Sequence, residues 1–195
     1  MSTLLVYHGT NQEFDNFDPS KSRIVNDNYG GIAFFTDNMD IAHNYAKSMF
    51  NKKGGSKVVL LTELKTNKIF DVDDIFTGRE LCKFYSSDRD IEDFARAASL
   101  LTASADKYDV IAKLKTGDTR LTGQEVFKGL SRGMTQTVKA RDKLKSLGYD
   151  TLRYNQQYPV KHSVYVTFAT SNIRITDRFI FDKAGNRYKL DKTVH

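Results

Sequence analysis

Three separated segments bring together residue types that can do chemistry. The first is VYHGT at 6–10, in which His8 closes an apolar run. The second is GGIAFFTD at 30–37, which continues to AHNYA at 42–46. The third is LGYDTL at 147–152, which leads to VYVTF at 164–168. A histidine at a strand end, an aromatic residue on a helix and a Gly-Gly pair each have ordinary structural explanations, but their joint occurrence favours a functional site.

Hydrophobic periodicity predicts the elements that position these segments. Strands are expected at 3–8, 32–35, 57–64, 68–72, 151–154, 163–168 and 179–181, with a hairpin turn at 183–186. Helices are expected from Met39 to Gly54-Gly55 (apolar face Ile41, Ala42, Tyr45, Ala46 and Met49), at 88–104, at 124–130 and at 137–147. Residues 107–115 fit no single pattern, and residues 11–31 read as a loop. The order of strands, then helices, then strands predicts an α+β fold.

Composition limits the class of protein. The chain has 195 residues and only two prolines, and no linker divides it, so a single domain over 1–195 is expected. Without a long apolar run or a basic leader, we expect a cytoplasmic protein with no membrane partner. Cys82 is the one cysteine, which excludes an intrachain disulfide. The net charge of +6 favours a polyanionic partner, either NAD+ or a nucleic acid, although a mild excess also serves solubility.

The motifs YHGT, GxxFFTD, AxxYA and LGYD together resemble the ADP-ribosyltransferase superfamily. The branch they resemble has a His-Tyr-Glu signature and includes diphtheria toxin and the poly(ADP-ribose) polymerases, and the chain is similar to its small bacterial and phage members. The resemblance covers residues 5–47 and 143–175, whereas 73–140 would be a helical insertion of unknown role. It implies split, strongly curved antiparallel sheets with flanking helices, and NAD+ as co-substrate.

The resemblance assigns roles around the nicotinamide end of NAD+. His8 matches the signature histidine that bonds a ribose hydroxyl, and the backbone of Gly9 would hold the carboxamide, where a side chain would block the approach. Tyr45 matches the tyrosine that stacks on the nicotinamide, and Phe34 falls at the first aromatic wall. Ala42 stands where the polymerases have a serine.

Further NAD+ contacts are expected on either side of these residues. Thr10 follows the signature glycine, and Arg23 lies in a loop that would reach the pyrophosphate by analogy, although a mobile loop is as plausible there. Nicotinamide in NAD+ is a pyridinium, and an aromatic face attracts such a cation by roughly 0.5–2 kcal/mol. It leaves as a neutral base, so no general acid is needed and an oxocarbenium-like ribose remains. The four histidines lack metal-ligand spacing, so no metal is expected.

The signature glutamate is missing. The alignment places Val164 at its position, and the neighbouring residues Ser163 and Tyr165 are not acidic either. Family members without this glutamate are limited to single transfers or are inactive. An acid could instead come from elsewhere, such as Asp150, or from the substrate.

Two segments are candidates for acceptor binding. One is the loop before the last core strand, with Gln156, Gln157, Lys161 and His162, which is otherwise an ordinary polar turn. The other is a basic run that includes Lys139 and Lys143 and extends over Arg132, Arg141 and Lys145. A solvated helix face is the simpler explanation of this run, and contact with a phosphate backbone is the functional one.

The sequence therefore predicts a mono-ADP-ribosyltransferase that modifies RNA, DNA or protein. By family analogy it would be a toxin or phage-conflict effector, with an antitoxin or inhibitor protein as a partner. Two alternatives stay open: an NAD+ glycohydrolase, and an inactive module that binds NAD+ or ADP-ribosylated partners. P-loop and Rossmann phosphate-binding motifs are absent from the sequence.

Overall fold

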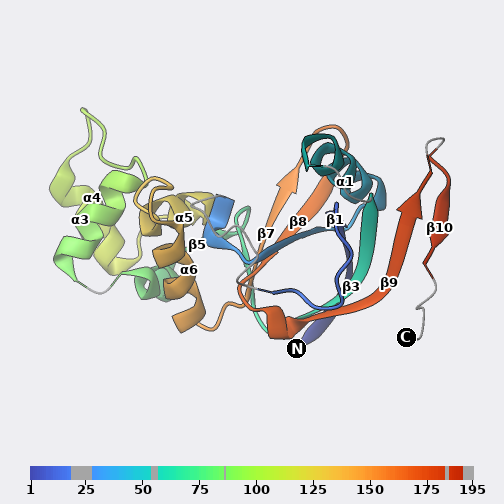
Figure 1. Ribbon diagram of the computed structural model, residues 1–195. Coiled ribbons are helices and arrows are strands. Elements are labelled where there is room, and N and C mark those ends of the chain that lie inside the picture. Colours follow the sequence, from blue (N-terminus) through green and yellow to red (C-terminus); the bar gives the residue numbers. More distant parts are fainter. Residues whose placement is uncertain (19–27, 54–56, 86, 183–184, 191–195) are drawn as a thin grey trace. The chain divides into compact units, whose positions relative to one another are not determined.

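A computed structural model describes residues 1–18, 28–53, 57–85, 87–182 and 185–190. Contacts between Cα atoms divide the chain into two compact units. The first comprises Met1–Ser22, Ile32–Asn67 and Asn155–His195, and the second Arg23–Gly31 and Lys68–Tyr154. Figure 1 shows both units coloured along the sequence. The expectation of one domain stays a prediction, because packing contacts do not measure independent folding.

The first unit is built on an antiparallel sheet. Its strands are β1 (Ser2–Thr10), β2 (Ala33–Thr36), β3 (Val58–Thr66), β8 (His162–Thr167), β9 (Ile173–Phe181) and β10 (Arg187–Lys189). They lie in the order β10-β9-β3-β1-β2-β8, and β9 is visibly bent in Figure 1. A short 3-10 turn, Thr170–Asn172, connects β8 to β9. This curved sheet with flanking helices confirms the α+β class.

The ladder between β1 and β2 consists of a single residue pair. The ladder between β1 and β3 is continuous, from Ser2↔Thr66 to Thr10↔Val58. In contrast, β1 and β2 are joined only at Tyr7↔Thr36. Beyond Tyr7 the ladder between the two strands does not continue, although both strands belong to one sheet.

Strand register sorts the side chains onto two faces, because paired residues on adjacent strands point the same way. Thr36 pairs with Val164, so Tyr7, Thr36 and Val164 share one face. His8 pairs with Leu60, and Phe35 pairs with Tyr165, which places both pairs on the opposite face. A buried apolar cluster lies on the His8 face and consists of Val6, Ala33, Phe35, Leu64 and Tyr165.

Helix α1 (Met39–Lys53) packs against β1 and β3. Its first turn is capped by the Asn38 carboxamide, whose Oδ1 accepts bonds from the backbone N–H groups of Asp40 and Ile41 at 3.0 and 3.2 Å. A Cβ on Gly9 would lie 1.8 Å from the Ala42 carbonyl oxygen, so the helix backbone rests directly on this glycine. Gly9 shares the parity of Tyr7 along β1, which places α1 on the face opposite His8.

The second unit is mostly helical. It contains α2 (Gly78–Leu81), α3 (Asp88–Ala97), α4 (Lys107–Thr116), α5 (Gly123–Leu130) and α6 (Thr137–Ser146), with the 3-10 turns Asn28–Gly30 and Cys82–Phe84. Strand β4 (Ile69–Asp71) pairs in parallel with β7 (Thr151–Gln156), and β5 (Ile75–Phe76) pairs with β6 (Leu121–Thr122). Phe70, Phe76, Phe84 and Tyr149 form an aromatic core with ring centroids 5.2–6.5 Å apart.

Two predicted elements differ from the structure, and one segment without a predicted element forms a helix. The helix expected over 88–104 ends at Ala97, because Ser99 adopts a left-handed φ of 62°. The ambiguous segment 107–115 is α4, which is capped by the Asp106 carboxylate. Strand β9 begins at Ile173 instead of 179, and its charged residues concealed the pattern. Residues 183 and 184 of the expected hairpin, and the expected helix stop at Gly54-Gly55, lie outside the described residues, although β9 and β10 do pair as a hairpin.

Candidate functional site around His8

His8 spans the gap between β1 and β2 with its side chain. Its Nδ1 lies 2.8 Å from the main-chain oxygen of Phe34. A carbonyl oxygen can only accept, so Nδ1 carries the proton and donates it. In the neutral ring Nε2 is then an acceptor, and within the described residues it has no hydrogen-bond partner. The geometry therefore leaves one imidazole nitrogen available to a hydroxyl donor.

Aromatic rings surround the imidazole of His8. The ring centroids of Phe14, Phe17 and Phe35 lie 6.2, 5.1 and 5.6 Å from it, the first two in edge-to-face geometry. Burial among these rings lowers the pKa of His8, and the hydrogen bond to Phe34 opposes that effect only in part. The imidazole is consequently neutral at pH 7, the state in which Nε2 can accept a hydrogen bond.

Gly9 is the strand residue next to His8. The turn of α1 that carries Tyr45 packs with its backbone directly on this glycine. A Cβ on Gly9 would lie 1.8 Å from the Ala42 oxygen and 2.9 Å from the Ala46 nitrogen. Close packing of α1 is therefore a structural reason for glycine here, and the carboxamide contact stays a prediction. Ala42 and Ala46 are buried, whereas Tyr45 is 55% exposed. The sequence pattern placed Tyr45 on the apolar face of the helix, but its ring is open to a ligand.

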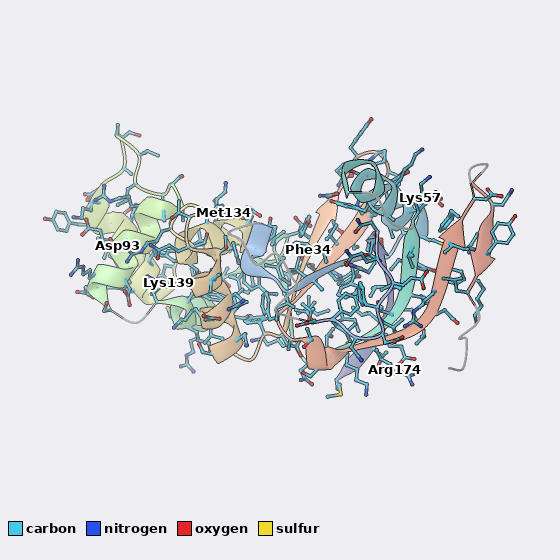
Figure 2. All side chains as sticks on the ribbon, in the orientation of Figure 1. Phe34, Lys57, Asp93, Met134, Lys139 and Arg174 are labelled. Atoms are coloured by element: carbon cyan, nitrogen blue, oxygen red, sulfur yellow. The ribbon has the colours of Figure 1, made fainter. Side chains whose placement is uncertain are left out.

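The other residues expected to bind NAD+ have mixed positions. Phe34 is half-buried and supplies the carbonyl group that holds His8; Figure 2 labels it. Thr10 ends β1, and its Oγ1 accepts a bond from the backbone N–H of Gln12 at 3.2 Å. Arg23 lies outside the described residues. Val164 is buried at 5% exposure and points to the face opposite His8, so the structure does not bring these two side chains together.

Several residues that share the His8 face were not assigned a role from the sequence. On β8 they are Ser163, Tyr165 and Thr167, which alternate with Val164. Phe14 and Phe17 lie in the segment expected to be a plain loop. The three-residue spacing of these two phenylalanines within a polar stretch was the available signal that the segment packs inward.

Most residues of the loop that was expected to select the acceptor are exposed to solvent. Gln157 and Lys161 are exposed, and Gln156 is half-buried. His162 differs, because it is 4% exposed and its Nδ1 donates to the Val160 carbonyl at 2.8 Å. A buried imidazole cannot contact a macromolecule without rearrangement, so the contact expected for His162 would require the loop to move.

The basic run lies in the second unit and is partly neutralised. Arg132 pairs with Asp93 at 3.3 Å, and Arg141 pairs with Asp142 at 2.9 Å. Arg141 also donates to the main-chain oxygen of Gly30 at 3.2 Å. The exposed Lys139, labelled in Figure 2, and the half-buried Lys143 lie four residues apart on one side of α6. Lys145 is exposed on a different side of this helix.

Candidate membrane-spanning helices and metal-ligand clusters are absent from the described ranges. No helix there is long and apolar enough to cross a bilayer. Nor do three His, Cys, Asp or Glu side chains gather there as metal ligands would, and the expectation of no metal stays a prediction. His43 is half-buried and stacks on Phe181 with ring centroids 3.8 Å apart.

The comparison with protein families matches one family over most of the chain, across both units. Residues 2–178 match the family ART-PolyVal, described as ADP-ribosyltransferase in polyvalent proteins. No curated protein matches the chain. A solved structure described as an anti-CRISPR protein is similar at 10% identity, with a TM-score of 0.37 over 89% of this chain and 96% of that chain. A TM-score this low does not establish a shared fold.

Proposed function

Because the chain belongs to the family of ADP-ribosyltransferase domains of polyvalent proteins, we propose that it binds NAD+ beside His8 and transfers single ADP-ribose units to a macromolecular acceptor. The observation that carries this proposal is the state of His8. The Phe34 carbonyl fixes its tautomer, burial keeps it neutral, and Nε2 is left as an acceptor. A ribose hydroxyl that donates to Nε2 would be held in one orientation, and correct orientation of the reacting groups raises the rate.

The proposed transfer reaction requires little proton transfer from the protein. The bond between ribose C1′ and the nicotinamide nitrogen breaks with its electron pair going to nicotinamide, which leaves as a neutral base. A nucleophilic oxygen or nitrogen of the acceptor then bonds to C1′ and loses its proton to solvent or to a nearby base. The protein must hold the sugar while positive charge develops on it.

Tyr45 is the proposed stacking surface for the nicotinamide ring. It is 55% exposed, and it lies on the turn of α1 that contacts Gly9. Phe34 is proposed as the second wall, because its side chain is half-buried and points to the sheet face on which α1 packs, opposite His8. Stacking on a pyridinium contributes roughly 0.5–2 kcal/mol per ring, mainly to ground-state binding.

Strand β8 supports the restriction to single transfers. No residue of His162–Thr167 is acidic, so this strand offers no carboxylate to activate an ADP-ribose hydroxyl as the next acceptor. The same feature favours a second candidate function, NAD+ hydrolysis, in which water takes the acceptor's place and needs less positioning. Both functions use the same His8 and Tyr45.

The acceptor is proposed to be a nucleic acid that contacts Lys139 and Lys143. These lysines lie on one side of α6, and the chain carries a net charge of +6. A cytoplasmic effector role, as a toxin or in phage conflict with an inhibitor protein as partner, is part of the same proposal. It rests on the family resemblance alone.

Labelled NAD+ incubated with the protein and a cell lysate separates these functions. Label that becomes attached to macromolecules and is removed by nuclease supports nucleic-acid transfer, and removal by protease supports a protein acceptor. Free ADP-ribose without macromolecular label supports hydrolysis. Charge reversal at Lys139 and Lys143 should lower nucleic-acid labelling and its salt dependence, while Lys145→Glu serves as the matched control.

A further inference from the structure

Residues 11–18, here called the strap, cross the sheet face that carries His8. The inward-turned side chains of the strap are Phe14 and Phe17, which are half-buried, while most of its other residues are exposed. Both phenylalanine rings contact the imidazole of His8, and they contact each other edge to face at 4.9 Å. Phe17 also packs on Phe35 at 5.4 Å. Among the described residues, the strap therefore supplies two of the three aromatic rings that pack around His8.

Arg178 fastens the strap to the sheet. It pairs with Leu60 across β9 and β3, and Leu60 pairs with His8, so Arg178 and His8 share a face two strands apart. Its Nη2 donates to the main-chain oxygen of Phe14 at 3.1 Å and to the Asp15 carboxylate at 2.5 Å. The guanidinium side chain is only 12% exposed. A buried charged group with two such bonds is a firm anchor, because breaking them would leave the charge without partners.

We propose that Arg178 is a positioning residue for the NAD+ reaction: it anchors the strap so that Phe14 and Phe17 hold the His8 imidazole in the orientation that a ribose hydroxyl requires. The inference rests on the proposed function. It adds a residue from β9, outside the four motifs that carry the family resemblance.

The surroundings of His8 support an influence of Arg178 on the His8 imidazole through the strap, and not through the charge of Arg178 itself. Burial lowers the pKa of His8 and the Phe34 hydrogen bond partly opposes it, and no charged group is among the causes of the shift. Around the imidazole, β9 contributes Arg178 and the strap contributes Asp15, which neutralise each other. From β8 the facing titratable group is Tyr165. Strap contacts therefore dominate the environment of the ring.

This arrangement predicts that the His8 pKa changes in the same direction when either of two oppositely charged residues is replaced. Loosening the strap would expose His8 to water, so Arg178→Ala and Asp15→Ala should both raise the His8 pKa toward the ordinary histidine value. Direct electrostatics predicts opposite signs, because loss of a cation raises the pKa of an imidazole and loss of a carboxylate lowers it. Asp15 is 90% exposed in its side chain, so its replacement leaves the core intact.

The test is titration of His8 by NMR of the imidazole resonances in the full chain without NAD+, followed by nicotinamide release at saturating NAD+. The matched control is Arg174→Ala. Arg174 lies near the start of the same strand (Figure 2) and pairs with Glu63 at 2.6 Å, away from the strap, with a side chain that is 68% exposed.

We expect a raised His8 pKa and about a tenfold loss of turnover in both strap variants, with a smaller change in KM, and neither effect in Arg174→Ala. A His8 pKa that falls or stays unchanged in Asp15→Ala would overturn the proposal, as would equal effects in Arg174→Ala. Absence of nicotinamide release in the parent protein would count against the proposed function, while the titration would still judge the role of Arg178.

Discussion

The imidazole of His8 and the main-chain carbonyl of Phe34 are joined by a 2.8 Å hydrogen bond across the gap where β1 parts from β2. This bond fixes the ring tautomer, because only Nδ1 can be the donor. It also uses a backbone acceptor in a region where β1 and β2 no longer pair. The end of the ladder between β1 and β2 and the orientation of the candidate active-site histidine are thus one structural feature.

The lowered pKa of His8 predicts a pH dependence of stability. Burial depresses the pKa in the folded state, so as pH falls the unfolded chain binds this proton first. The stability contribution of His8 should be fully present above the ordinary histidine pKa and should decline as pH falls through it toward the folded value. His8→Gln should reduce this decline in urea unfolding between about pH 8 and about pH 5. An identical pH dependence in the variant and the parent protein would contradict the environment described for His8.

Gly9→Ala should lower the free energy of unfolding by about 3 kcal/mol, because the added Cβ would lie 1.8 Å from the Ala42 oxygen and would push α1 away from β1. The control is Gly148→Ala, where a Cβ meets no atom within 4 Å and only the positive φ opposes the change, at about 1–2 kcal/mol. Denaturant unfolding compares the two. Equal losses would show that α1 does not pack on Gly9 as described.

Tyr45→Ala should weaken NAD+ binding about tenfold while unfolding stability changes by no more than about 0.5 kcal/mol, because the side chain is 55% exposed. Tyr45→Phe should bind nearly as the parent does, since the ring face makes the contact. Calorimetric titration with NAD+ measures both variants. Tyr108→Ala, at an 82% exposed tyrosine of α4, is the control. Unchanged affinity in Tyr45→Ala would remove Tyr45 from the site.

Val164→Glu and Ser163→Glu should differ because their side chains point to opposite faces of β8. Val164 is 5% exposed, so a carboxylate there should cost several kcal/mol of stability without raising NAD+ hydrolysis. Ser163 is half-buried on the His8 face, and Ser163→Glu should fold and raise hydrolysis. Nicotinamide release and thermal unfolding are measured for both. Increased release in Val164→Glu alone would support Val164 as the glutamate position.

The sequence predicts the first unit well because its signals are local. Alternation along β1 and the Asn38 cap of α1 are decided by neighbouring residues, and His8, Gly9 and Tyr45 lie in short motifs. In β9, Arg174 and Asp177 interrupt the apolar pattern. Each forms an ion pair with a neighbouring strand, Arg174 with Glu63 and Asp177 with Lys189. Such partners become visible only when the strands are assembled.

The contacts that complete the candidate site are long-range and therefore escaped prediction. Arg178 and Phe14 are 164 residues apart in sequence, and their bond depends on the register of β9 against β3. The sheet face to which the Val164 side chain points likewise depends on the Thr36↔Val164 pair, and a register shift of one residue would reverse it. Motif alignment gives residue identities along one chain, whereas the face on which a residue lies is set by its neighbours in the sheet.

The most direct test of the central claim is nicotinamide release from NAD+ by the parent protein, His8→Ala and His43→Ala, with folding checked by circular dichroism. His43 is the appropriate control because it is also a half-buried histidine with a lowered pKa, but it stacks on Phe181 and has no place in the proposed site. The account predicts release by the parent and by His43→Ala, and a loss of at least about a hundredfold in His8→Ala. Release by folded His8→Ala at the parental rate would contradict the assignment of His8 as the residue that holds the ribose.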